Sequence, residues 1–458
     1  MRSVEVFVAP QSLQQLADRP INGEKDITQG NQVMEELKKQ PARCQSCVVV
    51  DCNGRILVAY LGLRSESNTQ HNPPRGLQPF RATDLLRRAK PISELYENAT
   101  RKDMSSPDQY YDGLPEDMCK RQYEATQRMA AYNQPSLSRR DVRHIDGAED
   151  DGPDPRLVRL PHHPGLVLSD YRPADEIGTR ARTVLEGRSR SKVYPDDWQP
   201  PKEVGVIWER TGVYHHCHAC NVEDVISPSK NMTGSGIHAG GVRQFFLSTK
   251  EVTIFIAEIF KQLFPQEYKT YAGDFESGIW IPEDRGPFLC HATVYKLQVH
   301  LRREELDVGP TISFPTGYFK GGAIIFTDLR AKFEYSAGHI CFSMTHHLYH
   351  AVEKWEAIPC PPEVAQRRIT PGRISTVHFM HLNTLQELKD KPRDWLVRTN
   401  GGVNSVIHQP PNPKQAARMV KRKEREADQK ERRVRKETHR DEVQARQVGR
   451  EAKKARIE

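Results

Sequence analysis

The amino-acid sequence predicts a mainly β protein with flanking helices, an α+β chain built around a jelly-roll core. Three observations lead to this fold class. Two apolar runs near the N-terminus are separated by a turn signal, one strong helical pattern stands in the middle of the chain, and many short strand-like segments broken by glycine and proline follow it up to Phe379.

The first element is a β-hairpin in the stretch CVVVDCNGRILVAYLGL. Asn53 and Gly54 supply a tight turn between its two apolar runs, because both residues tolerate the positive φ angles of hairpin turns. We expect the hairpin at 44–63, within an N-terminal accessory region over 1–63.

From 64 to 201 the composition shifts to Arg, Asp, Pro, Ser and Gln, which predicts a flexible, largely disordered linker or insertion. Order is expected again over 202–386, the jelly-roll domain. Its clearest helix is predicted from Ser248 to Phe264, because Ser248 and Glu251 form a capping-box pattern and Pro265 follows as a stop signal.

The C-terminal part is expected to be a linker over 387–412 and a basic helical or disordered tail over 413–458. From Lys414 onward there are 17 Lys/Arg against 9 Asp/Glu, a surplus equal to the net charge of +8 of the whole chain. Lys421, Arg422 and Lys423 therefore become candidate contacts to nucleic-acid phosphates or a nuclear import signal. The alternative is a charged tail without a specific partner.

Several classes of protein are disfavoured by composition. No run approaches the roughly 18 apolar residues that a membrane span requires, and Met1 to Pro20 lacks the apolar core of a signal peptide. The nine cysteines are unevenly spaced, which does not indicate a disulfide framework. We expect an intracellular protein with reduced thiols and no membrane segment.

Four motifs follow one another between His300 and Phe379: VHLRREELDVGP, GYFKGGAIIFTDL, the run ending LYHAVEKW, and ITPGRISTVHF. Their order and local sequence resemble the fungal TET/JBP-like branch of the 2-oxoglutarate- and iron(II)-dependent dioxygenases, which oxidise methylated bases in nucleic acid. The resemblance implies a double-stranded β-helix, iron(II) and 2-oxoglutarate as cofactors, and DNA as a partner of a nuclear protein.

The resemblance also implies roles for single residues. His350 takes the place of the second histidine ligand of iron, and Arg373 that of the arginine which binds the distal carboxylate of 2-oxoglutarate. Ser375 would share the face of Arg373 on a strand and help to hold the same carboxylate.

The sequence departs from the family at the first pair of ligands. Aligned on Asp307, the acidic ligand falls on Glu304 and the histidine ligand on Arg302. A guanidinium cannot coordinate a cation, but it could form a salt bridge to Glu304. His300 is a substitute ligand only if the strand breaks between it and Glu304.

Two functions therefore stay open. The first is a 2-oxoglutarate-dependent oxidoreductase acting on 5-methylcytosine or a related base. The second is a degenerate homologue that keeps the fold and nucleic-acid binding without catalysis. A structural zinc site formed by Cys44, Cys47, Cys217 and Cys220 is a further alternative, weakened by the distance between the two pairs in the sequence.

Overall fold

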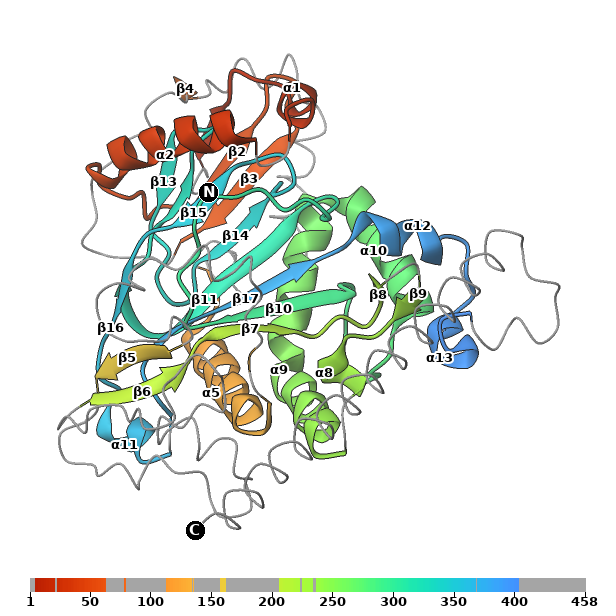
Figure 1. Ribbon diagram of the computed structural model, residues 1–458. Coiled ribbons are helices and arrows are strands. Elements are labelled where there is room, and N and C mark those ends of the chain that lie inside the picture. The colour runs from red at the N-terminus through yellow and green to blue at the C-terminus, as the bar shows by residue number, and fades with distance from the viewer. Residues whose placement is uncertain are drawn as a thin grey trace, which may run out of the picture. The chain divides into compact units, whose positions relative to one another are not determined.

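Two β-sheets of unequal size form the centre of the protein, seen here in a computed structural model (Figure 1). The structure describes residues 5–20, 23–62, 78–79, 113–133, 135, 157–161, 206–222, 225–233, 236–367 and 369–402. The chain divides into two units, 1–397 and 398–458, and the description below concerns the first.

The strands are β1 (Glu5–Val8), β2 (Cys47–Val50), β3 (Ile56–Leu61), β4 (Gln78–Pro79), β5 (Leu157–Pro161), β6 (Val206–Arg210), β7 (Gly212–His215), β8 (Cys220–Val222), β9 (Val225–Ser227), β10 (Cys290–Tyr295), β11 (Thr311–Gly321), β12 (Ile324–Phe326), β13 (Ala331–Phe333), β14 (Ile340–Ser343), β15 (His350–Val352), β16 (Trp355–Ala357) and β17 (Gly372–Phe379). The helices are α1 (Leu13–Ala17), α2 (Glu24–Lys38), α5 (Glu116–Tyr132), α8 (Lys230–Thr233), α9 (Gly236–Leu263), α10 (Pro265–Gly278), α11 (Pro362–Ala365), α12 (Leu382–Leu388) and α13 (Trp395–Thr399).

The strand order identifies the fold. The strand order of the large sheet is β4-β1-β2-β3-β14-β11-β17-β10-β7, and that of the small sheet is β13-β12-β15. Arg302 extends the small sheet, because it forms an isolated β-bridge with His350 of β15. From β10 onward the chain passes back and forth between the two sheets: β10, β11, β14 and β17 enter the large one, and the Arg302 segment, β12, β13 and β15 the small one. This alternation is the jelly-roll arrangement. The fold is a double-stranded β-helix, as predicted.

Strand alternation gives the large sheet two different faces. On β17, Ser375 and Val377 line a cavity between the sheets. Thr376 and His378 point the other way, since Thr376 accepts a hydrogen bond from Gln122 of α5 and the ring of His378 packs against Phe288. One face of the sheet is therefore the wall of the cavity, and the other is the floor of a core covered by helices.

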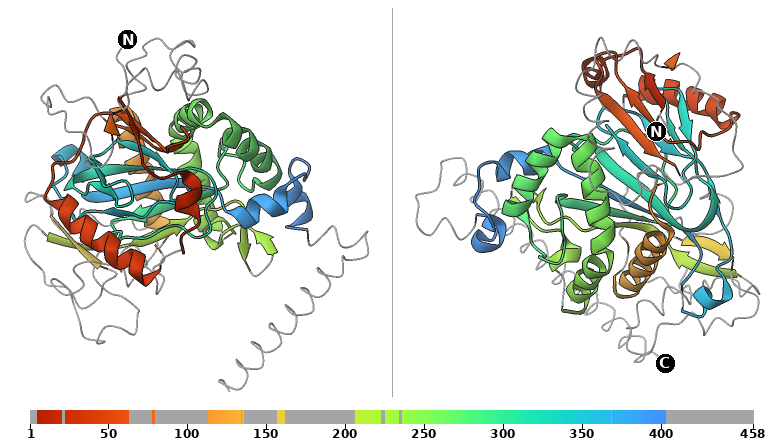
Figure 2. Two further views of the ribbon diagram at one scale, coloured as in Figure 1. Left: turned by 90° about the horizontal axis from the view of Figure 1, so that it is seen from above. Right: turned by 180° about the vertical axis from the view of Figure 1, so that it is seen from behind.

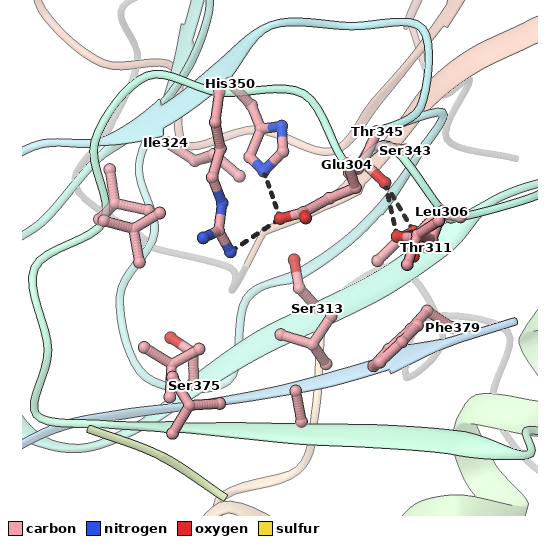
Figure 3. A pocket seen from close by; sticks show the side chains of 18 of the residues that line it. Glu304, Leu306, Thr311, Ser313, Ile324, Ser343, Thr345, His350, Ser375 and Phe379 are labelled. Carbon is pink, nitrogen blue, oxygen red and sulfur yellow. Dashed lines mark hydrogen bonds and ion pairs between the residues drawn. The ribbon is translucent and has the colours of Figure 1, made fainter. Parts of the chain in front are cut away.

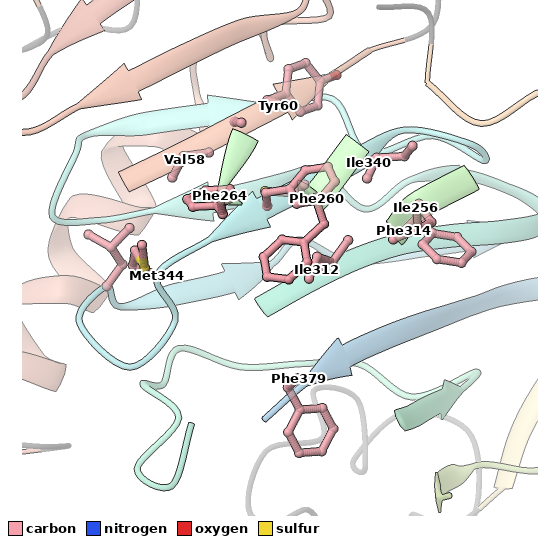
Figure 4. Packing of buried hydrophobic residues seen from close by; sticks show 14 of the residues in the cluster. Val58, Tyr60, Ile256, Phe260, Phe264, Ile312, Phe314, Ile340, Met344 and Phe379 are labelled. Atoms are coloured by element: carbon pink, nitrogen blue, oxygen red, sulfur yellow. The ribbon is translucent and has the colours of Figure 1, made fainter. Parts of the chain in front are cut away.

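Helix α9 covers that second face of the large sheet (Figures 1 and 2). Its side chains Ile256 and Phe260, and Phe264 just after it, gather with Ile312 and Phe314 of β11 in one buried apolar cluster (Figure 4). Burial of each such side chain contributes about 1.5–3 kcal/mol to folding. This packing fixes the wall of the cavity from behind.

The start of α9 corrects the sequence prediction. The helix begins at Gly236, so Ser248 lies inside it and the predicted capping box is wrong. Val242, Phe245 and Phe246 continue the buried face upstream of Ser248. Their burial outweighs the low helix propensity of the glycines in this segment. Pro265 does end α9, but it also begins α10, which the sequence pattern did not predict.

Helix α2 packs on the outer face of the small sheet, opposite the cavity (Figure 1). Its residues Ile27 and Met34 contact a buried group formed by Leu301, Tyr349 and Ala351. On β15, Ala351 therefore faces the helix, whereas His350 and Val352 face the cavity.

The N-terminal hairpin is present as β2 and β3, but it does not stand apart from the jelly roll. β3 pairs with β14 in antiparallel register, which makes the hairpin part of the large sheet. Within 64–201 the structure describes α5, an ordered helix that packs against α9. Its buried face includes the polar residues Gln122, Thr126 and Gln127, which explains why hydrophobic periodicity did not reveal it.

Two predictions on the C-terminal part have different outcomes. Helix α13 lies inside the range expected to be a linker. The basic tail, with Lys421, Arg422 and Lys423, lies outside the described residues. Among the residues that the structure does describe, no helix is long and apolar enough to cross a membrane.

Candidate functional site

A cavity of about 520 Å³ lies between the two sheets. The large sheet contributes Ser313, Ser343 and Ser375, and the small sheet Ile324, His350 and Val352. Figure 3 shows Glu304 and His350 at one end, Ser375 at the other, and Ser313 between them. Glu305 and Leu306 also line the cavity and are exposed, so the opening lies beside Glu304.

Backbone pairing sets the geometry at the Glu304 end. The amide N–H of Arg302 donates to the carbonyl of His350 and the amide N–H of His350 to the carbonyl of Arg302, both at 3.0 Å. Residues in such a hydrogen-bonded pair present their side chains on the same face of a sheet. Arg302 and Glu304 both line the cavity, whereas Arg303 between them turns away and donates from Nε to the carbonyl of His346.

An ion pair lies at this end of the cavity. Arg302 Nη2 lies 2.7 Å from Glu304 Oε1, and the two side chains are about one-third exposed, at 27% and 31%. The pair joins the residue at the expected histidine position to the residue at the expected acidic position. The Glu304 carboxylate is therefore already engaged with a cation of the protein.

His350 has a defined tautomer. Its Nδ1 lies 3.3 Å from the carbonyl oxygen of Leu348, which can only accept, so Nδ1 carries the hydrogen. Burial lowers the pKa of His350, which keeps the ring neutral. Nε2 then directs a lone pair toward Glu304 Oε1, 4.0 Å away. These two atoms are arranged as metal donors.

A complete iron site nevertheless does not fit the residues present. Iron(II) oxygenases of this fold require two histidines and one carboxylate on one face of the metal. Here the third position is the guanidinium of Arg302, which donates hydrogen bonds and repels cations. His300, the possible substitute, is not among the residues that line the cavity, where Val299 takes part instead.

The opposite end of the cavity is suited to a carboxylate. Arg373 is only 2% exposed, and its Nε and Nη2 have no hydrogen-bond partner. Ser375, two residues along β17, is also buried, and its hydroxyl has no partner. Desolvation lowers the pKa of Arg373 to about 10, so the side chain remains charged at neutral pH.

An unpaired buried cation costs several kcal/mol, and an anion that accepts from Arg373 would remove this cost. The rings of Tyr335 and Phe319 flank the guanidinium, with centroids 5.0 and 5.6 Å from Cζ, and hold its position. The distal carboxylate of 2-oxoglutarate fits this end, although the iron does not fit the other.

Two further groups in the cavity were not recognised as functional from the sequence. Asp307 served only to align the motif and His381 carried no predicted role, yet both line the cavity. Asp307 Oδ2 accepts hydrogen bonds from Thr311 and Thr345 at 2.9 and 3.2 Å. Burial, with the nearby charge of Glu304, raises the pKa of Asp307 to about 8. For His381, the only signal in the sequence was its spacing of two residues from Phe379, because residues two apart on a strand share a face.

Asp307→Asn is expected to reduce the pH dependence of stability. The Asp307 carboxyl has an ordinary pKa of 3.8 and a folded-state pKa of about 8. Between these values the folded chain binds one more proton than the unfolded chain, so the free energy of unfolding falls as pH rises, by up to about 1.4 kcal/mol per pH unit. Urea unfolding of both proteins at pH 5 and pH 7.5 measures the difference. Equal slopes for the two proteins would contradict the assignment.

A second cluster of possible metal ligands lies among the helix-covered groups, outside the cavity lining. Within the described residues, one group of three side chains brings its possible ligand atoms close together: His218, Asp284 and His291. Nε2 of both histidines lies 2.8 Å from Asp284 Oδ2. His218 Nδ1 accepts from the backbone N–H of Trp280 and Ile281, at 3.0 and 3.2 Å, so its hydrogen must be on Nε2.

That tautomer makes His218 a donor to Asp284 and leaves no lone pair on Nε2 for a metal. Since Nδ1 already accepts two N–H groups, the hydrogen cannot move there without clashing with them. The cluster is a buried hydrogen-bond network. No cysteine belongs to it, and among the described residues Cys44, Cys47, Cys217 and Cys220 form no group of metal donors.

Comparison with known proteins adds little to this geometry. No family model matches the chain, and no curated protein matches its sequence. Among solved structures, NgTET1 in complex with 5mC DNA is similar over 81% of this chain and 94% of its own, at 10% identity and a TM-score of 0.35. OsALKBH1 is similar over 30% and 63%, at 15% identity and a TM-score of 0.20. These scores are too low to bear on the site, so the fold rests on the strand order.

Proposed function

We propose that this chain is a degenerate, nucleic-acid-binding member of the TET/JBP-like dioxygenases, of the fungal branch, that has lost oxidation chemistry. The Arg302–Glu304 ion pair carries this proposal, because it occupies the position where a histidine and a carboxylate would hold iron. The motifs between His300 and Phe379 support the family, and the basic tail supports nucleic acid, DNA in particular, as the partner of a nuclear protein.

The residues of the cavity have separate roles in this proposal. Arg302 neutralises Glu304 and keeps a divalent cation away from His350. Arg373 and Ser375 keep the carboxylate-binding end, where 2-oxoglutarate would bind in an active relative. The cavity would therefore bind a small acid without turning it over.

Anaerobic titration of the purified full-length chain with iron(II) and 2-oxoglutarate tests this function. We expect no metal-to-ligand charge-transfer band, and no succinate above the background without protein once air is admitted. A saturable band, with succinate formed in proportion to the protein, would overturn the proposal.

An active oxygenase acting on 5-methylcytosine or a related base is the second candidate. It is favoured by one observation, the lone pair of His350 Nε2 that faces Glu304 Oε1 at 4.0 Å. If Arg302 turned aside and another donor took its place, these two atoms could share an ion. Formation of hydroxymethylcytosine from methylated DNA, in the presence of iron and 2-oxoglutarate, would establish this candidate in place of the first.

A further inference from the structure

We propose that the cavity is a metal-independent binding site for a short dicarboxylate, held at one end by Arg373 and Ser375 and at the other by Arg302. The inference rests on the proposed function, in which the Arg302–Glu304 ion pair excludes a metal ion from this end of the cavity. It assigns to Arg302 the task that a metal ion performs in an active oxygenase, which is to bind the second carboxylate. The ligand class includes 2-oxoglutarate and glutarate.

The inner end has the donors for the first carboxylate. Arg373 offers Nε and Nη2, two N–H groups of one planar fork, and neither has a partner in the protein. Such a fork binds the two oxygens of a carboxylate with parallel hydrogen bonds. The hydroxyl of Ser375, buried and also without a partner, lies on the same strand face and adds a third donor.

The outer end has a second guanidinium. Arg302 lines the cavity, and its Nε is buried without a hydrogen-bond partner, although Nη2 pairs with Glu304. Glu304 uses only part of the fork, so an incoming carboxylate can accept from the remaining N–H groups. Because Asp307 is protonated below about pH 8, it adds little negative charge against an anionic ligand at neutral pH.

The middle of the cavity can distinguish a keto acid from a plain dicarboxylate. Ser313 lies between Glu304 and Ser375 in the cavity (Figure 3). The hydroxyl of Tyr335 donates to Ser313 Oγ at 2.5 Å, which leaves the hydrogen of Ser313 to be donated elsewhere. A 2-oxo group can accept it, so 2-oxoglutarate should bind more tightly than glutarate.

Isothermal titration calorimetry of the full-length protein in EDTA tests the site with three ligands: 2-oxoglutarate, glutarate and butyrate, which has a single carboxylate. We expect 2-oxoglutarate to bind most tightly and butyrate most weakly. Arg373→Met should weaken all three by at least about 30-fold, since it removes a bidentate charged contact. It should not unfold the protein, because the unpaired nitrogens of Arg373 make no hydrogen bonds that folding needs.

Arg302→Met distinguishes the contribution of the outer end of the site to binding from that of the inner end. It should weaken glutarate by about 10-fold and leave butyrate within about twofold of wild type, because butyrate has no second carboxylate to bind Arg302. Arg330→Met is the matched control: Arg330 forms an ion pair with Glu36 on the surface, and its loss should change neither affinity.

Three results would overturn the inference: no heat from any dicarboxylate in EDTA, binding that appears only when iron is added, or equal weakening of glutarate and butyrate by Arg302→Met. The proposed function fails on a different measurement. An iron-dependent charge-transfer band would overturn it whatever the calorimetry shows, whereas absence of both the band and the glutarate heat would overturn the dicarboxylate site alone.

Discussion

Arg302→His should convert a protein without iron-dependent activity into one that binds iron(II) and decarboxylates 2-oxoglutarate. Position 302 forms a hydrogen-bonded backbone pair with His350, so an imidazole there would lie beside His350 on the cavity face. Glu304, released from its ion pair, would supply the carboxylate. Two histidines and one carboxylate are the set that iron(II) needs.

The anaerobic charge-transfer band and succinate formation in air measure this gain. We expect a clear band in Arg302→His and none in wild type, with succinate formed in proportion to the Arg302→His protein and none above background with wild type. Arg302→Leu is the matched control, because it breaks the ion pair without adding a nitrogen or oxygen donor. If Arg302→His gave no band, His350 and Glu304 would not be the donor pair that their 4.0 Å separation indicates.

Glu209→Ala should be among the most destabilising single substitutions in the chain. Glu209 on β6 pairs with the fully buried Lys296 and accepts a hydrogen bond from Tyr295 at 2.5 Å. Thr370 Oγ1 lies 2.7 Å from the same carboxylate. Removing Glu209 leaves the Lys296 ammonium buried without a counter-charge, which costs about 3–5 kcal/mol.

Chemical denaturation of Glu209→Ala and of Glu356→Ala measures this cost against a control. Glu356 forms the same kind of pair with Lys320 at 3.0 Å, but both side chains are well exposed. Water compensates most of that interaction, so its loss should change the free energy of unfolding by no more than about 0.5 kcal/mol. Similar losses for the two variants would contradict the view that burial decides the strength of the pair.

Local spacing was enough to predict part of the cavity from the sequence. Arg373 and Ser375 are two residues apart on β17, so strand alternation places both on one face. Arg302 and Glu304 have the same spacing and also line the cavity, although only Arg302 is paired, through an isolated bridge to His350. The glycine-broken strands likewise indicated a jelly roll before any pairing was known.

The rest depended on residues far apart in the chain. Lys296 and Glu209 are separated by 87 positions, and no local pattern connects them. The raised pKa of Asp307 comes from burial and from its distance to Glu304, which only the folded backbone sets. Helix α5 escaped detection because half of its buried residues, Gln122, Thr126 and Gln127, are polar, and Gln122 finds its partner in Thr376 of β17.

The pairing of β3 with β14 has a consequence for the order in which the protein can fold. The hydroxyl of Tyr60 on β3 lies within hydrogen-bond distance, 2.7 Å, of Nδ1 of His339, just before β14, across 279 positions of sequence. During synthesis the hairpin leaves the ribosome long before β14, so one edge of β3 stays unpaired until most of the domain has been made. Contacts at such separation slow folding and expose strand edges to mispairing. One edge of β3 is therefore among the early parts of the sheet to be made and among the last to be paired.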